Sequence, residues 1–292
     1  MEYSVFDAHR DTLCIAADKG RSLRKNDAMI DFRRMSRYKS YTQIFACWIE
    51  PKYLPRALER GMKLIDTYYE NPCNYKNIRT ILSIEGGELI SSVEVLRNLY
   101  RLGVRIIALT WNYSNHIASG ADEKDTERGL TEFGKIIVNE MNRIGMYIDV
   151  SHLNDRSFYD IEKITNVPII ATHSNSRSIC RHRRNLTDDM FKRIIRSGGC
   201  VGINFYPPFL NESNRADIDD IVCHIEHFMS LGGENSIGIG ADFDGVDALP
   251  EGINGCEDVY KVFDRLLQLN YSEDLVEKIS HKNFENLFYG GK

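Results

Sequence analysis

The sequence predicts an α/β protein folded as a single (β/α)₈ TIM barrel over residues 1–292. Its length is ordinary for one such barrel, which typically needs about 250 residues. Eight short runs rich in apolar and β-branched residues alternate with longer amphipathic stretches along the whole chain. No low-complexity segment or long flexible linker separates these units. Alternating strands and helices favour a parallel sheet covered by helices, and eight units favour closure into a barrel.

The expected strands are the mostly apolar runs, which are typical of strands buried on both faces of a parallel sheet. They are residues 3–9, 41–49, 78–85, 104–111, 146–152, 168–173, 200–206 and 237–242. The expected helices are the stretches between them in which apolar residues recur at helical spacing. They are residues 56–69, 89–102, 130–144, 155–164, 187–197, 218–231, 259–269 and 272–288. Thr187 and Ser272, each followed by two acidic residues, are suitable helix starts.

The composition of the chain argues against several classes of function. A net charge of −5 and a pI of about 5.9 argue against binding of nucleic acid, because no basic excess can neutralise phosphates. We expect no membrane interaction and a cytoplasmic location, because neither a signal peptide nor an 18-residue apolar stretch is evident. Seven scattered cysteines without a CxxC pair favour free thiols over disulfides and indicate no cysteine-bound zinc.

Most of the expected strands end in a polar or aromatic residue that can take part in chemistry. These residues are His9, Glu85, Trp111, His152, His173, Tyr206 and Asp242. In a barrel the carboxyl ends of the strands meet at one rim, where active sites form. Packing alone does not explain three histidines and two carboxylates at these positions.

Histidine and carboxylate in this arrangement indicate a metal site. His9 and Asp11 stand two residues apart, so on an extended strand both side chains can reach one ion. His152 and His173 are 21 residues apart, the length of one short βα unit, which places them on adjacent strands. Glu85 closes an apolar strand before two glycines and could bridge two metals. Taken alone, the H-x-D pair could equally serve as a cap or salt bridge, and Glu85 could equally cap the next helix.

Three further positions carry alternatives. Asp242 could accept a proton from an attacking water, with Asp244 as the competing candidate. Arg184 could hold a carboxylate through two hydrogen bonds, or it could be a solvated loop charge. His224 and His227 could bind metal in principle, but they fall on an outer helix and are interpreted as surface or core residues.

At this point the residues resemble a known family, the membrane (renal) dipeptidase family of metallopeptidases, in its microbial form. The matching motifs are His9-x-Asp11, Glu85-Gly86-Gly87, His152, His173-Ser174-x-Ser176, Arg183-Arg184-Asn185 and Gly240-Ala241-Asp242-Phe243-Asp244-Gly245. They run from about residue 6 to about residue 287, in the family's order and spacing. The resemblance implies a barrel of the metal-dependent hydrolase type and a possible homodimer.

The resemblance also implies roles for individual residues. Two Zn²⁺ ions would be bound, one by His9 and Asp11 and the other by His152 and His173, with Glu85 bridging. Arg184 would bind the substrate's carboxylate, and Asp242 would contact its amine or transfer a proton. Trp111 and Asn112, at the fourth strand, would also contact the substrate. Family members of the mammalian type carry histidine where Trp111 stands, and an indole offers no proton-accepting nitrogen. Asn112 or His116 is a candidate to compensate.

The implied reaction is hydrolysis of a dipeptide, including one with a C-terminal D-residue, through a metal-bridging hydroxide. A rival hypothesis on the same site is another amide hydrolase, such as an N-acyl-amino-acid deacylase. A rival of another class is a metal-stabilised binding protein without turnover. A Rossmann-type dehydrogenase is set aside, because no G-x-G-x-x-G follows a strand.

Overall fold

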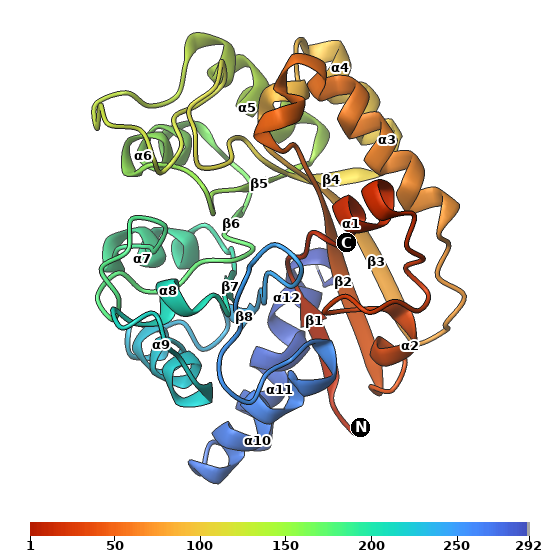
Figure 1. The fold of residues 1–292 in the computed structure, drawn as a ribbon. Coiled ribbons are helices and arrows are strands. Elements are labelled where there is room, and N and C mark those ends of the chain that lie inside the picture. Colours follow the sequence, from red (N-terminus) through yellow and green to blue (C-terminus); the bar gives the residue numbers. More distant parts are fainter. Residues whose placement is uncertain (291–292) are drawn as a thin grey trace.

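Eight parallel strands form the centre of the computed structural model, which describes residues 1–290, and helices surround them (Figure 1). The strand order in the sheet is β6-β5-β4-β3-β2-β1-β8-β7, and every pair is parallel. The strands are β1 (Ser4–Asp7), β2 (Ser40–Trp48), β3 (Ile78–Glu85), β4 (Val104–Ala108), β5 (Tyr147–Asp149), β6 (Ile169–Ile170), β7 (Val201–Ile203) and β8 (Ile237–Ile239).

The sheet closes into a barrel between β6 and β7. There the contact is an isolated parallel bridge between Ala171 and Val201 rather than a continuous ladder. The Ala171 N–H donates to the Cys200 carbonyl at 3.0 Å, and the Gly202 N–H donates to the Ala171 carbonyl at 2.8 Å. The (β/α)₈ TIM barrel predicted from the sequence is therefore confirmed.

Helices cover the outside of the barrel. The α-helices are α1 (Thr12–Lys19), α2 (Phe32–Met35), α3 (Ala57–Glu70), α4 (Val93–Arg101), α5 (Glu132–Ile144), α6 (Asp155–Ile164), α7 (Asp188–Arg196), α8 (Pro207–Leu210), α9 (Ile218–Ser230), α10 (Tyr260–Gln268), α11 (Glu273–Glu277) and α12 (Asn283–Tyr289). Short 3₁₀ segments lie at Pro51–Arg56, Gly87–Leu89 and Cys256–Asp258, and a π-helical turn at Lys278–Lys282 joins α11 to α12. Within residues 1–290 no helix is both long and apolar enough to cross a membrane.

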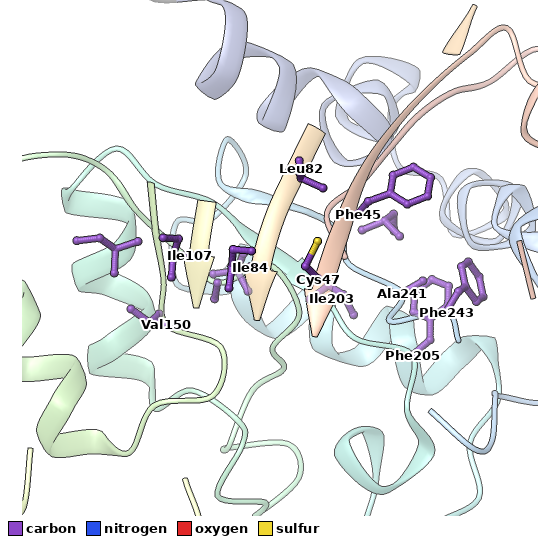
Figure 2. Close-up of a cluster of buried hydrophobic side chains, with 14 of the residues drawn as sticks. Phe45, Cys47, Leu82, Ile84, Ile107, Val150, Ile203, Phe205, Ala241 and Phe243 are labelled. Carbon is purple, nitrogen blue, oxygen red and sulfur yellow. The ribbon is translucent and has the colours of Figure 1, made fainter. Parts of the chain in front are cut away.

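The main core lies between the strands and this helical layer. Figure 2 shows Phe45 and Cys47 of β2 beside Leu82 and Ile84 of β3, all of them buried. Side chains two residues apart on a strand point to the same face of the sheet, so Phe45 and Cys47 share one face, as do Leu82 and Ile84. The strands therefore bury both faces, as their continuous apolar composition indicates.

A second, smaller core closes the amino-terminal end of the barrel. The ring of Phe6 stacks on Phe284 and Phe288 of α12, with ring centroids 5.1 Å and 5.5 Å apart. The Tyr147 hydroxyl donates to the Leu287 carbonyl at 2.9 Å and fixes the helix there. The opposite, carboxyl end of the barrel is thus the end that remains available for a site.

The expected elements differ from the observed ones mainly at their ends. Strand β3 has the predicted bounds, and Thr187 and Ser272 cap α7 and α11 with their side chains as expected. The other strands are shorter than predicted at their carboxyl ends, because the chain leaves the sheet before the functional residues. Helices α1, α2 and α8 were not predicted, and the single expected helix over residues 272–288 contains the π-helical turn. Of the expected domain 1–292, residues 291 and 292 lie outside the described part.

Candidate metal centre and the cavity above it

The five predicted metal ligands meet at the carboxyl end of the barrel. His9 follows β1, Asp11 stands directly before α1, Glu85 is the last residue of β3, and His152 and His173 follow β5 and β6. All five are buried, with at most 6% of their surface exposed. The barrel topology brings together residues that are up to 164 positions apart in the chain.

Glu85 lies between the two histidine groups, with one carboxylate oxygen toward each. Its Oε2 is 3.5 Å from Nε2 of His9, and its Oε1 is 2.5 Å from Nε2 of His152 and 3.6 Å from Nε2 of His173. Asp11 Oδ2 is 3.6 Å from the same His9 nitrogen. Two groups of candidate metal ligands share Glu85: His9, Asp11 and Glu85, and Glu85, His152 and His173. A third group joins His9, Asp149 and His173.

The five predicted ligands form a metal cradle, and it contains buried polar atoms that lack hydrogen-bond partners in the protein. His9 Nε2 and Asp11 Oδ1 make no hydrogen bond, although both are shielded from water. Nε2 of His152 and Nε2 of His173 are only 2.8 Å apart. Leaving such groups without a partner is costly, and a cation beside them would satisfy imidazole and carboxylate donors together. This donor set of nitrogen and oxygen suits zinc.

The electrostatics of the cradle favour neutral imidazoles on one side. Burial and the Arg184 charge lower the pKa of His152 to about 4, and burial with the neighbouring imidazoles holds the pKa of His173 well below its usual range. A neutral imidazole is the form that binds a metal. Burial also lowers the pKa of His9, but the carboxylates of Glu85 and Asp11 outweigh it and raise that pKa well above its usual range. His9 therefore sits where a positive charge is stabilised.

Asp242 lies beside the cradle rather than inside it. Its Oδ1 is 3.9 Å from Nε2 of His9, and its Oδ2 accepts a hydrogen bond of 2.9 Å from the Asn204 amide. Burial and the charge of Glu85 raise the pKa of Asp242 to about 6, although His9 lowers it in part. The backbone of Asp242 has a φ of 63°, a left-handed conformation that aspartate tolerates better than most residues. The carboxyl group is thus held facing the centre and close to its protonation range.

The competing candidate, Asp244, has a different environment. Its carboxylate accepts hydrogen bonds from the Thr12 hydroxyl and, at 2.8 Å, from the Met29 N–H. It therefore ties the loop after β8 to α1 and to the segment before α2. Asp244 does not line the cavity described below, whereas Asp242 does.

Arg184 lies on the other side of the cradle, on the loop between β6 and α7. Arg184 is only 4% exposed, and neither Nε nor Nη1 of its guanidinium has a hydrogen-bond partner. Nη2 is 3.2 Å from Nε2 of His152, and the group lies over the ring of Phe209 at 5.4 Å. Burial lowers the pKa of Arg184 to about 10, so the group still carries its charge at neutral pH. A buried cation with two unused donors is prepared to bind an anionic group.

The residues around Arg184 hold its loop in place. Arg183 points away and pairs with Asp122 at 2.8 Å. The Asn185 amide donates to the carbonyls of Cys180 and Phe209, both at 2.9 Å. Arg183 and Asn185, which flank Arg184 in the motif, therefore serve the loop rather than the cavity.

A cavity of about 360 Å³ opens above the metal cradle. It is lined by Asp11, Trp48, Glu85, Trp111, Asn112, His152, Arg184, Tyr206, Phe209, Asp242, Gly245, Val246 and Asp247. The rings of Trp48 and Trp111 lie 5.3 Å apart and form an aromatic wall. The volume is at the low end for small-molecule sites, which suits a ligand of a few residues at most.

The remaining predicted residues separate into two groups. Trp111 and Asn112 line the cavity, and Asn112 Oδ1 is also 2.8 Å from Nδ1 of His152. His116 does not line it, because its Nε2 bonds to the Ile90 carbonyl at 2.8 Å. His224 and His227 are bonded to groups other than the five predicted metal ligands. His224 is buried and joins the Leu210 carbonyl to the Ser176 N–H, and His227 pairs with Asp188 at 2.8 Å.

The sequence analysis missed several residues of this site. Trp48 is the last residue of β2 and pairs in register with Glu85, so the rule of polar and aromatic strand ends could have identified it. Asn204 follows β7 and holds Asp242, and Asp247 lies at the cavity wall. No motif marked Asn204 or Asp247, since their role depends on contacts between distant segments.

Comparison with known proteins agrees with this geometry. The model of the membrane dipeptidase family, peptidase family M19, matches residues 1–288. An uncharacterized dipeptidase of Schizosaccharomyces pombe is 34% identical over 275 residues, which cover 82% of this chain and 65% of the relative. The chain therefore spans about two-thirds of the length of that curated relative.

Solved structures share the fold. The dipeptidase AC, a metallopeptidase of family M19, superposes with a TM-score of 0.88 at 24% identity and covers 98% of both chains. A metallopeptidase from Rhodobacter sphaeroides, liganded with a phosphinate mimic of the dipeptide L-Ala-D-Ala, has a TM-score of 0.86 at 23% identity, with 98% of this chain and 99% of that chain covered. The probable dipeptidase PvdM from Pseudomonas aeruginosa has a TM-score of 0.84 at 17% identity, with coverages of 97% and 94%.

Proposed function

Because the chain belongs to the membrane dipeptidase family of metallopeptidases, we propose that it hydrolyses dipeptides at a centre of two zinc ions. The observation that carries the proposal is the position of Glu85, whose two oxygens face His9 on one side and the pair His152 and His173 on the other. His9 and Asp11 would hold one ion, His152 and His173 the other, and Glu85 both. When bound, the ions would activate a water molecule and polarise the peptide carbonyl.

The protein's own groups would position the substrate around this centre. Arg184 offers two unused donors to the C-terminal carboxylate of a dipeptide. This contact fixes the peptide bond relative to the cradle, which converts binding energy into orientation. Trp48 and Trp111 would cover an apolar side chain and keep bulk water away from it. The cavity of about 360 Å³ favours dipeptides over longer peptides.

Asp242 would move the proton. Its carboxylate faces the cradle at 3.9 Å from His9, and Asn204 fixes its orientation. A pKa raised to about 6 places the group in the range where it can accept a proton from the attacking water and return it to the leaving amine. Water adds across the peptide bond, and two free amino acids leave.

We further propose that dipeptides with a D-residue at the C-terminal side are accepted. The support is the resemblance described in the sequence analysis and the structural neighbour from Rhodobacter sphaeroides, which is liganded with a mimic of L-Ala-D-Ala. We also propose a cytoplasmic location, with which the seven free cysteines agree. The possible homodimer remains a prediction from the family resemblance.

A substrate panel tests the proposed function. Zinc-loaded and chelated protein are each incubated with L,L- and L,D-dipeptides, and amino acid release is measured. We expect activity that is lost with the chelator and restored by zinc. N-acyl-amino acids are included because the aromatic wall beside Trp111 would also suit an apolar acyl group. Cleavage of these alone, with no release from any dipeptide, would replace the dipeptidase proposal with the deacylase alternative.

A further inference from the structure

A buried hydroxyl lies directly behind the metal cradle, between two of its histidines. It belongs to Thr172, which follows β6 and has no solvent exposure. Its Oγ1 is 2.8 Å from Nδ1 of His173, 3.2 Å from Nδ1 of His9 and 2.5 Å from Oδ2 of Asp149. Asp149 is the last residue of β5 and is also buried.

The hydrogen-bonding capacity of these groups determines the direction of each bond. The Thr172 hydroxyl donates its single proton to Oδ2 of Asp149. The hydroxyl oxygen then has two lone pairs left, and both imidazoles must donate to it from Nδ1. These three contacts use the full capacity of the hydroxyl group. The Ser151 hydroxyl, 3.4 Å from Thr172 Oγ1, donates its proton to Asp149 Oδ1 instead.

The direction of these bonds decides which nitrogen of each histidine can bind a metal. An imidazole that donates from Nδ1 can offer a lone pair to a metal only from Nε2. Nε2 of His9 is 3.5 Å from one oxygen of Glu85, and Nε2 of His173 is 3.6 Å from the other. One hydroxyl therefore prepares one ligand on each side of Glu85.

The backbone around Thr172 is held tightly. The Thr172 N–H donates to Asp149 Oδ1 at 3.0 Å, and the same oxygen accepts the Ser151 hydroxyl at 2.6 Å. A Cβ atom built on Gly202 or Gly240 would lie 2.2 Å or 1.8 Å from the Thr172 carbonyl oxygen. Only glycine permits this close approach of β7 and of the residue after β8, so the backbone of Thr172 cannot shift toward them.

We propose that Thr172, oriented by Asp149, is a positioning residue shared by both metal sites, an inference that rests on the binuclear centre of the proposed function. Its hydroxyl selects the tautomer and fixes the ring orientation of His9 and His173 together. His152 is served separately, because its Nδ1 lies 2.8 Å from Asn112 Oδ1. Partners of this kind typically change metal affinity about 10–100-fold when they are removed.

Four variants of the full chain test the proposal. Thr172→Val removes the hydroxyl at nearly constant volume, and Thr172→Ser retains it. Asn112→Ala removes the separate partner of His152, and Asp149→Asn removes the charge of the residue that orients Thr172. Zinc affinity is measured by competition with a chromophoric chelator, and zinc content is measured after dialysis. Circular dichroism of the metal-free proteins checks that each variant is folded.

We expect wild type to bind two zinc ions and Thr172→Val to bind both about 10–100-fold more weakly. Thr172→Ser should restore both affinities to near wild type, and Asn112→Ala should weaken only one. Wild-type zinc affinity at either site in Thr172→Val, or a Thr172→Ser variant as weak as Thr172→Val, would overturn the shared role.

Asp149 forms a further group with His9 and His173 that could hold a metal. Loss of a whole zinc ion in Asp149→Asn with Thr172→Val unaffected would make Asp149 a ligand and likewise overturn the proposal. A wild type that binds no zinc would instead refute the proposed metal centre.

Discussion

Replacement of Arg184 by methionine should remove recognition of the substrate carboxylate while leaving the metal centre in place. Methionine keeps the apolar stem beside Phe209 and removes a buried charge that has two unsatisfied donors. The variant should therefore be at least as stable as wild type without substrate, since an uncompensated buried charge is costly. Thermal unfolding of the metal-free proteins checks this point.

The size of the kinetic effect follows from the two unpartnered nitrogens, Nε and Nη1 of Arg184. Hydrogen bonds to charged groups contribute about 1.5–3 kcal/mol each. Two such bonds total about 3–6 kcal/mol, which corresponds to a loss in kcat/KM of about 10²–10⁴-fold, at about 1.4 kcal/mol per factor of ten. The contact exists in the bound substrate as well as in the transition state, so the loss should appear largely in KM.

Dipeptide amides provide the matched control, because they lack the carboxylate that Arg184 is proposed to bind. Steady-state hydrolysis of a dipeptide and its amide is measured with wild type and with Arg184→Met. We expect the amide to be a poor substrate for wild type and to lose little more in the variant. An equal loss on both substrates would show that Arg184 acts on the centre itself, and the reasoning above would be refuted.

Three further predictions concern catalysis and stability. Asp242→Asn should lower kcat by about 10²–10⁴-fold, the usual contribution of general acid–base catalysis, with zinc content unchanged; loss of zinc would make Asp242 a ligand. Burial lowers the pKa of His224 from 6.5 to about 4. Between these pH values the unfolded chain binds a proton at His224 and the folded chain does not. The free energy of unfolding should therefore fall by about 3 kcal/mol as the pH drops from 6.5 to 4. Urea unfolding should show a shallower pH dependence in His224→Gln, and parallel profiles would contradict this. Hydrogen bonds from Arg143 and Arg97 lower the pKa of Glu140 to about 2, which stabilises the fold above pH 4.5 and is lost as the pH falls toward 2. After discounting for solvent around the arginines, Glu140→Gln should lose about 1 kcal/mol at pH 7 and progressively less below pH 4.5, and a constant difference would exclude the ion pairs as its cause.

The strands could be predicted because their physical environment leaves a strong signal. Strands of a parallel barrel are mostly buried on both faces and are rich in apolar residues. Residues 78–85 form β3 with the predicted bounds, and their last four positions are buried. The short helices left no such signal. Helix α8 has four residues and begins with two prolines, and α2 has four residues within a polar segment. Their position is decided by packing against the barrel, which local sequence does not record.

The metal cradle could be anticipated because topology places strand ends at one rim. His152 and His173 were assigned to neighbouring strands from their spacing alone, and the structure brings their Nε2 atoms within 2.8 Å. The groups that orient them could not be found in this way. Thr172 and Asp149 look like ordinary residues of buried strands. Their role depends on the register of β5 with β6 and on the closed barrel, which brings His9 close to them. Trp48 was missed because the expected strand was extended one residue beyond its end.

The central claim is that two metal ions share Glu85 in one cradle at the carboxyl end of the barrel. A crystal structure of the zinc-loaded protein, with anomalous differences measured on both sides of the zinc absorption edge, tests it most directly. The account predicts two zinc peaks, one beside His9 and Asp11 and one beside His152 and His173, with Glu85 touching both. A single peak, or two peaks of which one lies outside contact with Glu85, would contradict it.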